Sequence, residues 1–256
     1  MKFLTIASAL VLASSVAAAP NTLKRQAGHR KRLAAMKGGP VKRVDGPAGN
    51  VSDVSYSSNW AGAVLTSTKV TEVTAEFTVP TPSSDGSGAA WVGIDGDSCQ
   101  TAILQTGIDW TKSGSSITYD AWYEWYPDYS YDFSGISLSA GDTIKATVTA
   151  TSKTAGKAVI ENVTKGTTVT HSFSGEGSEG DLCEYDAEWI VEDYEEGSSL
   201  VSFADFGSVT FTSASALIGG TTTSTSGASI IDIEQDSSVL TSCSVPSSSS
   251  VKCTYV

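Results

Sequence analysis

Residues 91–110 read Trp91-Val-Gly-Ile-Asp-Gly-Asp-Ser-Cys-Gln-Thr-Ala-Ile-Leu-Gln-Thr-Gly-Ile-Asp-Trp110, two apolar runs with a turn signal between them. The turn signal is Asp95-Gly-Asp97, and the run after it predicts a strand with an amide, Gln105, at its centre. Burying an amide without partners costs roughly 2–7 kcal/mol, so Gln105 needs a partner. Two interpretations stay open here: a core glutamine bonded to neighbouring backbone, or a glutamine of a functional site.

Outside this stretch, apolar and polar residues alternate with the period of two that is typical of strands. The alternation is clearest at residues 73–79, 144–150 and 169–173. Clusters of glycine and polar residues interrupt these runs, and no stretch has a sustained helical period with caps. The pattern predicts one all-β domain of antiparallel sheets, a sandwich or a barrel. The run at 219–227, rich in Thr and Ser, is predicted to be a loop.

The N-terminal part of the chain differs in kind from the rest. Residues 1–18 hold a lysine, an apolar stretch and small residues, which predicts a secretory signal too short to span a membrane. Residues 19–50 hold eight Lys/Arg, with three dibasic pairs, against one acid. We interpret 19–54 as a basic propeptide with processing sites, with a disordered basic tail as the alternative. The domain is expected at 55–256, in a secreted, extracellular protein.

From residue 51 onward, seven lysines, no arginine and 27 acidic residues give a net charge of about −20. So few cations argue against binding to nucleic acid, and no later apolar stretch is long enough to predict a membrane span. In acid most carboxylates approach neutrality and few cations remain to repel one another. The composition therefore predicts stability at low pH and fragility near neutrality.

Four cysteines in a secreted chain predict two disulfides. Cys243 and Cys253 flank a short segment that suits a hairpin, which leaves Cys99 to pair with Cys183. A zinc site is the weaker alternative, because the spacing has no close Cys pairs. Two sequons are candidate glycosylation sites if they are exposed, at Asn50 and Asn162.

The side chains available for chemistry are mainly carboxylates. His171 is the one histidine after residue 50 and lies on the apolar side of its predicted strand. The sequence therefore has too few histidines for a histidine metal site and argues against a nucleophilic triad. No metal and no cofactor are expected. In the acidic run 184–197, Glu188 and Glu192 share one strand face but lie roughly 13 Å apart, too far to share a proton. An acidic, solvent-facing surface is the alternative.

A third run, residues 119–128, places Trp122, Glu124 and Tyr126 on one strand face and further aromatic residues on the other. Aromatic side chains on both faces predict a strand with one face in the core and the other lining a cleft. Packing in the core alone is the alternative interpretation.

Four runs, residues 90–97, 101–107, 119–127 and 187–193, together resemble the fungal glutamic peptidases, or eqolisins. The resemblance covers most of the chain after residue 55. It implies a concanavalin-like sandwich of two curved antiparallel sheets with a substrate groove on the concave face. The family's catalytic pair falls on Gln105 and on Glu192, not on Glu188. The family's substrate-groove positions fall on Trp60, Trp91, Asp95, Asp109, Asp120, Trp122, Glu124 and Tyr126.

The resemblance implies an acid endopeptidase that acts on polypeptides, as a monomer, and is inhibited by its own basic propeptide. Glu192, with an unshifted pKa near ~4.3, would activate the attacking water. Gln105 keeps its N–H donors throughout the acid range and would stabilise the tetrahedral intermediate. Two other readings remain: a glycoside hydrolase with two carboxylates and Trp platforms, and a lectin-like module without catalysis.

Overall fold

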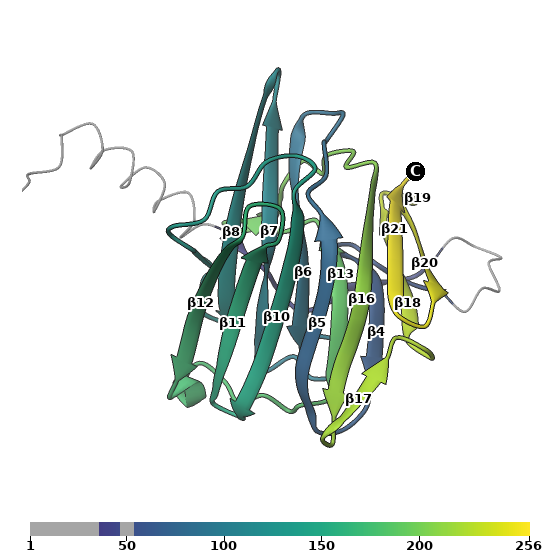
Figure 1. The fold of residues 1–256 in the computed structure, drawn as a ribbon. Helices are drawn as coiled ribbons and strands as arrows, with labels where there is room; N and C mark the ends of the chain where they lie inside the picture. Colours follow the sequence, from purple (N-terminus) through teal and green to yellow (C-terminus); the bar gives the residue numbers. More distant parts are fainter. Residues whose placement is uncertain (1–35, 47–53) are drawn as a thin grey trace, which may run out of the picture. The chain divides into compact units, whose positions relative to one another are not determined.

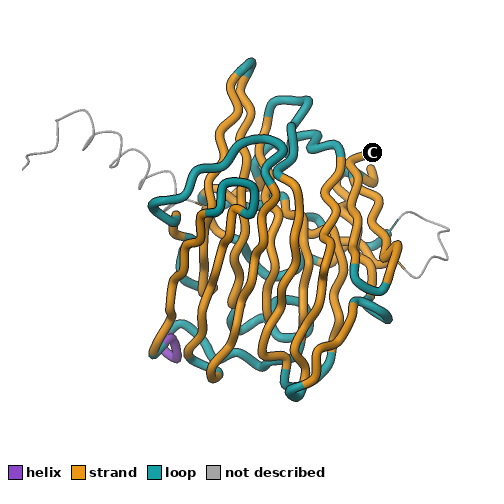
Figure 2. Tube along the Cα trace, viewed as in Figure 1, coloured by secondary structure: helices purple, strands orange, loops and turns teal. Residues whose placement is uncertain are grey.

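Strands form almost all of the regular structure (Figures 1 and 2). The structure, a computed structural model, describes residues 36–46 and 54–256, all of them within the unit 33–256. The predicted signal sequence and Asn50 lie outside the described residues. Among the described residues the only helix is one 3-10 turn, Glu176–Ser178, and no helix is long and apolar enough to cross a membrane.

The larger sheet has ten strands and carries every strand on which a catalytic residue is predicted. In spatial order its strands are β2 (Arg43–Val44), β3 (Val54–Ser57), β18 (Ser229–Gln235), β4 (Trp60–Thr66), β13 (Asp186–Glu192), β6 (Gly86–Ile94), β7 (Ile103–Ser113), β8 (Ser116–Tyr126) and β9 (Tyr131–Asp132), with β19 (Ser238–Val239) paired to β18. All neighbours are antiparallel except β3 and β18, which are parallel.

The second sheet has eight strands. In spatial order they are β12 (Thr167–Ser174), β11 (Ala155–Asn162), β10 (Thr143–Ser152), β5 (Val70–Thr78), β16 (Ser208–Ile218), β21 (Ser250–Tyr255) and β20 (Thr241–Ser247), with β17 (Thr221–Ser224) paired to β16. A small third sheet holds β1 (Met36–Lys37), β14 (Glu195–Glu196) and β15 (Ser199–Leu200).

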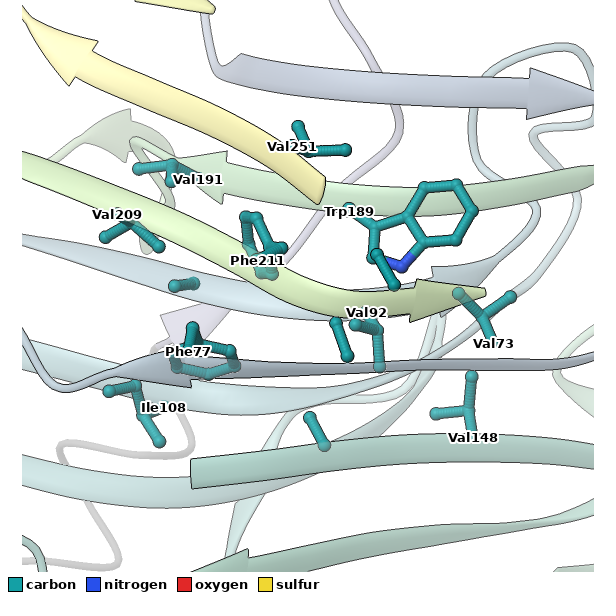
Figure 3. Close-up of a cluster of buried hydrophobic side chains, with 14 of the residues drawn as sticks. Val73, Phe77, Val92, Ile108, Val148, Trp189, Val191, Val209, Phe211 and Val251 are labelled. Atoms are coloured by element: carbon teal, nitrogen blue, oxygen red, sulfur yellow. The ribbon is translucent and has the colours of Figure 1, made fainter. Parts of the chain in front are cut away.

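The main core lies between the two large sheets (Figure 3). Val73 and Phe77 of β5 and Phe211 of β16 come from the eight-stranded sheet, and Trp189 and Val191 of β13 come from the ten-stranded sheet. Burying a large apolar side chain stabilises a fold by roughly 1.5–3 kcal/mol, so this shared layer holds the sheets face to face. The predicted all-β sandwich is confirmed.

The period of two predicted strands correctly at the runs where it was clearest, but a loop predicted from composition was partly wrong. The residues of 73–79 and 144–150 alternate in burial as predicted. The run 219–227, predicted as a loop, contains strand β17, which pairs with the end of β16 across a turn at Gly219 and Gly220. That prediction was wrong because Thr is β-branched and suits a strand even in a low-complexity run.

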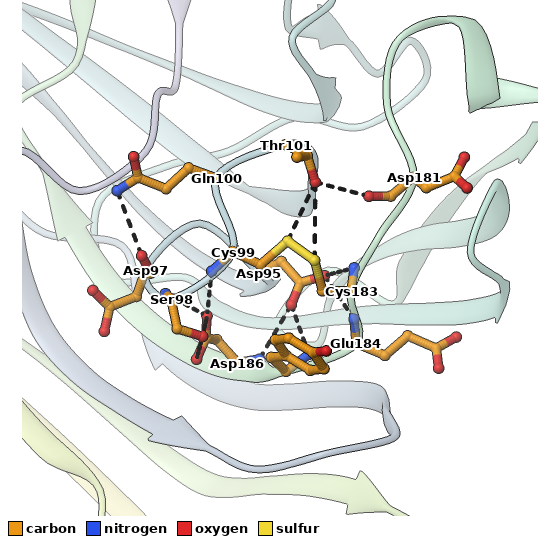
Figure 4. Close-up of a disulfide and its surroundings, with 11 residues drawn as sticks. Asp95, Asp97, Ser98, Cys99, Gln100, Thr101, Asp181, Cys183, Glu184 and Asp186 are labelled. Carbon is orange, nitrogen blue, oxygen red and sulfur yellow. Dashed lines mark hydrogen bonds between the residues drawn. A yellow bond between two sulfur atoms is a disulfide. The ribbon is translucent and has the colours of Figure 1, made fainter.

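Both predicted disulfides are confirmed, Cys99–Cys183 and Cys243–Cys253. The first ties the loop after β6 to the segment that leads into β13 (Figure 4). The exposure that a used sequon requires is not found at Asn162, because this residue is fully buried and its Nδ2 donates to Ser137 O and to the Asp142 carboxylate.

Candidate active site

The ten-stranded sheet buries a second apolar cluster on the face turned away from the main core. Along β13, Trp189 and Val191 belong to the main core, while Ile190 belongs to this second cluster. Because side chains alternate along a strand, Glu188 and Glu192 lie on the same face as Ile190, as the sequence predicted. We call the second cluster the outer floor; its buried members include Trp60, Trp91, Ile103, Trp122 and Ile190.

Gln105 lies on the outer floor near the start of β7. Its neighbours in the strand, Leu104 and Thr106, point to the opposite face, and Leu104 is part of the main core. Gln105 is fully buried and stands opposite Gly93 of β6 and Glu124 of β8. Its Nε2 donates to the backbone oxygen of Gly38, 3.4 Å away. The amide is therefore turned toward the outer floor and not into the main core.

Glu192 ends β13, opposite Trp60 of β4 and Ala89 of β6. Its Oε2 accepts a hydrogen bond of 2.8 Å from Trp91 Nε1, and its Oε1 accepts one of 3.3 Å from the Gly39 backbone N–H. Trp60 packs edge-on against Trp91, with ring centroids 4.9 Å apart. Three neighbouring strands thus fix the position of this carboxyl group.

Burial raises the pKa of Glu192 to about 8, although the Trp91 indole and the Gly39 N–H act in the opposite direction. The expectation of an unshifted pKa is therefore wrong for this form of the chain. A charged carboxylate loses its hydration when it is buried, and these donors, together with a smaller effect of Trp60, offset only part of that loss.

Residues 38–42 cross the outer floor directly over this pair. Gly38 N donates to Glu124 Oε2 at 3.2 Å. In the Gly38–Gly39 peptide bond, Gly38 O accepts from Gln105 and Gly39 N donates to Glu192. Val41 is buried among the residues of the outer floor. The predicted propeptide therefore contacts both predicted catalytic side chains.

Ion pairs anchor the end of this segment. Lys42 Nζ pairs with Glu195, and Arg43 pairs with Asp97 at 2.6 Å. Both pairs are partly exposed, so each is worth at most about 1 kcal/mol and weakens in salt. They match the predicted attraction between the basic propeptide and the acidic domain.

The model of the peptidase A4 family matches residues 58–255. The chain belongs to the peptidase A4 family. Aspergillopepsin-2 from Aspergillus niger is 51% identical over 284 aligned residues, and scytalidopepsin B from Scytalidium lignicola is 46% identical over 270. Both alignments cover 100% of this chain and 100% of the relative.

Solved structures of the A4 family share the sandwich. A scytalido-glutamic peptidase structure has a TM-score of 0.74 and 49% identity, and covers 78% of this chain and 98% of its own. Aspergilloglutamic peptidase from Aspergillus niger has a TM-score of 0.64 and 64% identity, and covers 66% and 99%. The resemblance read from the sequence is confirmed, and the chain is a peptidase. The glycoside hydrolase and lectin readings are set aside.

Among the groove positions that the A4 resemblance implied, Trp60, Trp91, Trp122 and Glu124 are buried on the outer floor or directly against the segment. Tyr126 packs at the edge of the floor, at the end of β8. Asp109 and Asp120 face each other across β7 and β8, four register positions beyond the pair of Gln105 and Glu124. These two aspartates lie along the same strands but away from the catalytic pair.

Asp95, the remaining predicted groove position, binds backbone in this structure. Both oxygens of its buried carboxylate accept backbone N–H groups from the segment 183–186, at 2.7–3.2 Å (Figure 4). Burial raises the pKa of Asp95, and these N–H donors lower it. All four contacts hold the chain where it enters β13, and the place of Asp95 in the substrate groove stays a prediction.

Glu188 shares a face with Glu192 but has different surroundings. It is fully buried, and burial raises its pKa well above the ordinary value; Asp186, Asp95 and Asp97 raise it further. The Gly38–Gly39 contacts fall on Glu192 and not on Glu188. Of the two acids, Glu192 is the one that shares a partner with Gln105, the Gly38–Gly39 peptide group.

Two polar residues near the site escaped the sequence analysis. Asn59 is buried, accepts the Lys42 N–H and donates to the Pro40 oxygen, and Gln100 Nε2 donates to the Val41 oxygen. Residue type gives no signal for such roles. The Gly-Gly-Pro run at 38–40, between basic residues, was the one visible hint, because glycine allows close approach of backbone.

Proposed function

We propose that this A4 peptidase is a secreted acid endopeptidase in which Glu192 and Gln105 act together on one peptide bond. The observation that carries the proposal is the Gly38–Gly39 peptide group, whose carbonyl accepts from Gln105 and whose N–H donates to Glu192. A substrate peptide bond held in the same way would meet a hydrogen-bond donor at its carbonyl oxygen and a carboxyl group at its nitrogen.

Glu192 is proposed to take a proton from the attacking water and to return it to the leaving amine. For this it must be ionised in acid. The segment 38–42 lies over the carboxyl group, and burial is the main cause of its raised pKa. We infer that removal of the segment admits water and lowers this pKa, while Trp91 Nε1 continues to favour the ionised form.

Gln105 is proposed to donate to the oxyanion of the tetrahedral intermediate. A carboxamide does not titrate, so this donor works at any acid pH. Removal of one such donor from comparable sites costs about 2.7–4 kcal/mol of transition-state stabilisation.

The relatives support a polypeptide substrate. A scytalido-glutamic peptidase binds a peptide-based transition-state analogue, and another eqolisin was solved with the tripeptide Ala-Ile-His. We propose that this chain likewise cleaves polypeptides, and that its residues 19–54 inhibit it until acid weakens the pairs of Lys42 and Arg43 with carboxylates.

The test compares hydrolysis of a denatured protein in acid by the processed enzyme and its variants. Gln105→Ala and Glu192→Ala should each lower kcat by at least about 100-fold, with unchanged circular dichroism. Glu188→Gln should stay active. Activity retained in Glu192→Ala but lost in Glu188→Gln would reverse the assignment of the carboxylate.

A further inference from the structure

The Gly38–Gly39 peptide group touches the two catalytic side chains at its two polar ends. Gly38 O lies 3.4 Å from Gln105 Nε2, and Gly39 N lies 3.3 Å from Glu192 Oε1. These are the two atoms of a scissile bond that a donor amide and a proton-returning acid must reach.

Every residue of the segment 38–42 is held through its backbone. Gly38 N and Gly39 N donate to Glu124 and Glu192, and Gly38 O accepts from Gln105. Further along, Asn59 binds Pro40 O and Lys42 N, Gly96 O accepts from Val41 N, and Gln100 binds Val41 O. Main-chain recognition of an extended peptide does not depend on its sequence, which is how a protease holds substrates of many sequences.

At one position, however, the fit depends on the residue. A Cβ built on Gly38 would lie 2.7 Å from Gln105 Nε2, 3.1 Å from Glu124 Oε2 and 3.3 Å from Gln105 Cδ. Both side chains are fully buried, so neither can move aside freely. A Cβ on the neighbouring Gly39 would meet nothing within 4 Å.

We propose that residues 38–42 are a pseudo-substrate: the Gly38–Gly39 bond occupies the position of the scissile bond, and the missing side chain at Gly38 is what lets the segment seat there. This rests on the proposed roles of Gln105 and Glu192. The segment inhibits and is not cleaved, because it covers Glu192: Gly39 N donates to Oε1 from one side and Trp91 Nε1 donates to Oε2 from the other. This burial raises the pKa of Glu192 to about 8, so the covered acid keeps its proton at acid pH and cannot take one from a water molecule.

The experiment uses the full chain, purified near neutral pH, as wild type, Gly38→Ala and Gly39→Ala. Each is mixed with a fluorogenic peptide in mild acid, and the initial rate before processing is measured. Gly38→Ala should raise this rate at least about tenfold, and Gly39→Ala should leave it within about twofold of wild type. Equal rates for the two variants, whether raised or unchanged, overturn the proposal.

Two further measurements complete the test. Synthetic peptides of residues 36–46 are added to the processed enzyme, where the Gly38→Ala peptide should inhibit at least about tenfold more weakly than the Gly39→Ala peptide. Mass spectrometry of the unprocessed chain should find the Gly38–Gly39 bond intact. Cleavage at that bond before any other overturns the pseudo-substrate.

The outcomes also separate this proposal from the proposed function. If Gln105→Ala and Glu192→Ala lose activity while the Gly38 and Gly39 variants behave alike, the catalytic roles stand and the pseudo-substrate fails. If Glu192→Ala keeps its activity on an added substrate, the proposed catalytic role of Glu192 is wrong, and the pseudo-substrate proposal that rests on it is wrong as well. Thermal melts of each variant serve as the control for folding. We expect the Gly38 variant to fold, because Gly38 lies outside the strands of the sandwich.

Discussion

The hydrogen bond from Trp91 Nε1 to Glu192 is the contact that most directly tunes the reactive carboxyl group. An indole N–H favours the ionised form of an acid, because it donates to the carboxylate more strongly than to the neutral acid. Trp60 packs on the same ring from β4 and keeps the indole in place. The pair of tryptophans therefore favours the ionised form of Glu192, on which the proposed role of this residue as a base depends.

We expect Trp91→Phe to raise the pKa of Glu192 in the processed enzyme. A hydrogen bond to a charged group is worth about 1.5–3 kcal/mol, so the acid limb of kcat/KM should move up by about one pH unit or more. The measurement is the pH profile of peptide hydrolysis.

Trp125→Phe is the matched control, because it removes an indole N–H that donates to Gly180 O and a ring that belongs to the main core. It should lower stability without moving the acid limb. If both variants move the limb equally, the effect is structural and the tuning role of Trp91 is rejected.

At this scale the sequence was least informative where two residues were alike. Glu188 and Glu192 have the same side chain on the same face of one strand, and the period of two could not separate them. What separates them is a partner from β6, Trp91, which lies 101 positions away in the chain. Family resemblance supplied that choice; the alternation of residues could not.

Among the elements, β13 depends most on contacts at its start. Asp95 binds four backbone N–H groups of residues 183–186, and Ser98 binds the Asp186 carboxylate (Figure 4). The Cys99–Cys183 disulfide joins the same two segments. Because β13 is only seven residues long, these contacts also set where Glu192 lies at its other end.

Asp95→Asn should therefore destabilise the domain although the side chain keeps its size. The new NH₂ group cannot accept, so it would face one of the two pairs of N–H donors that the carboxylate now satisfies. Asparagine tolerates the left-handed backbone of this position, at φ 68°. With about 1–3 kcal/mol for each buried donor left unpaired, we expect Tm to fall by roughly 5–15 °C.

The control for Asp95→Asn is Asp85→Asn, at an exposed aspartate that accepts a single backbone N–H from Gly114. Calorimetry of both variants at one pH near neutrality checks the prediction, because the comparison needs the Asp95 carboxylate in its ionised form. A fall in Tm no larger than that of the control would show that the clamp at Asp95 is not needed.

The strands themselves were the part of the fold most readily predicted. Val73, Phe77, Ile144 and Val148 alternate with polar residues, and burial follows that alternation. Strand β17 was missed because a Thr-Ser run carries no apolar face, and it becomes a strand only by pairing with β16. The seating of residues 38–42 could not be predicted either, since it depends on close approach of backbone and not on side-chain character.

For the whole molecule, the excess of acids predicted stability in acid, and the buried carboxyl groups give that prediction a mechanism. Burial raises the pKa of Glu192 to about 8, of Asp193 to about 7 and of Asp232 to about 6, and raises that of Glu188 well above its ordinary value. The folded chain thus holds protons that the unfolded chain releases above about pH 4.

The sign of the effect follows from linkage. Where the folded state binds more protons than the unfolded state, the free energy of unfolding falls as pH rises. These groups therefore contribute full stability below about pH 4. That stability is lost as pH rises through their folded pKa values, up to about 8 for Glu192. We expect a lower Tm at pH 8 than at pH 4 for the chain with its N-terminal segment in place; the opposite order would contradict this.

Glu188→Gln isolates one contribution to this pH dependence, because glutamine resembles the protonated acid and does not titrate. Glu188 is fully buried beside three carboxylates, so the wild type must keep it protonated or bury a charge as pH rises. The variant should match wild type near pH 4 and melt roughly 3–8 °C higher near pH 7.5, with a flatter dependence of Tm on pH. Glu161→Gln, on β11 of the opposite sheet and partly exposed, should change neither value. If Glu188→Gln melts below wild type at both pH values, its carboxyl group stabilises the fold through contacts, and fragility near neutrality must come from the other buried acids.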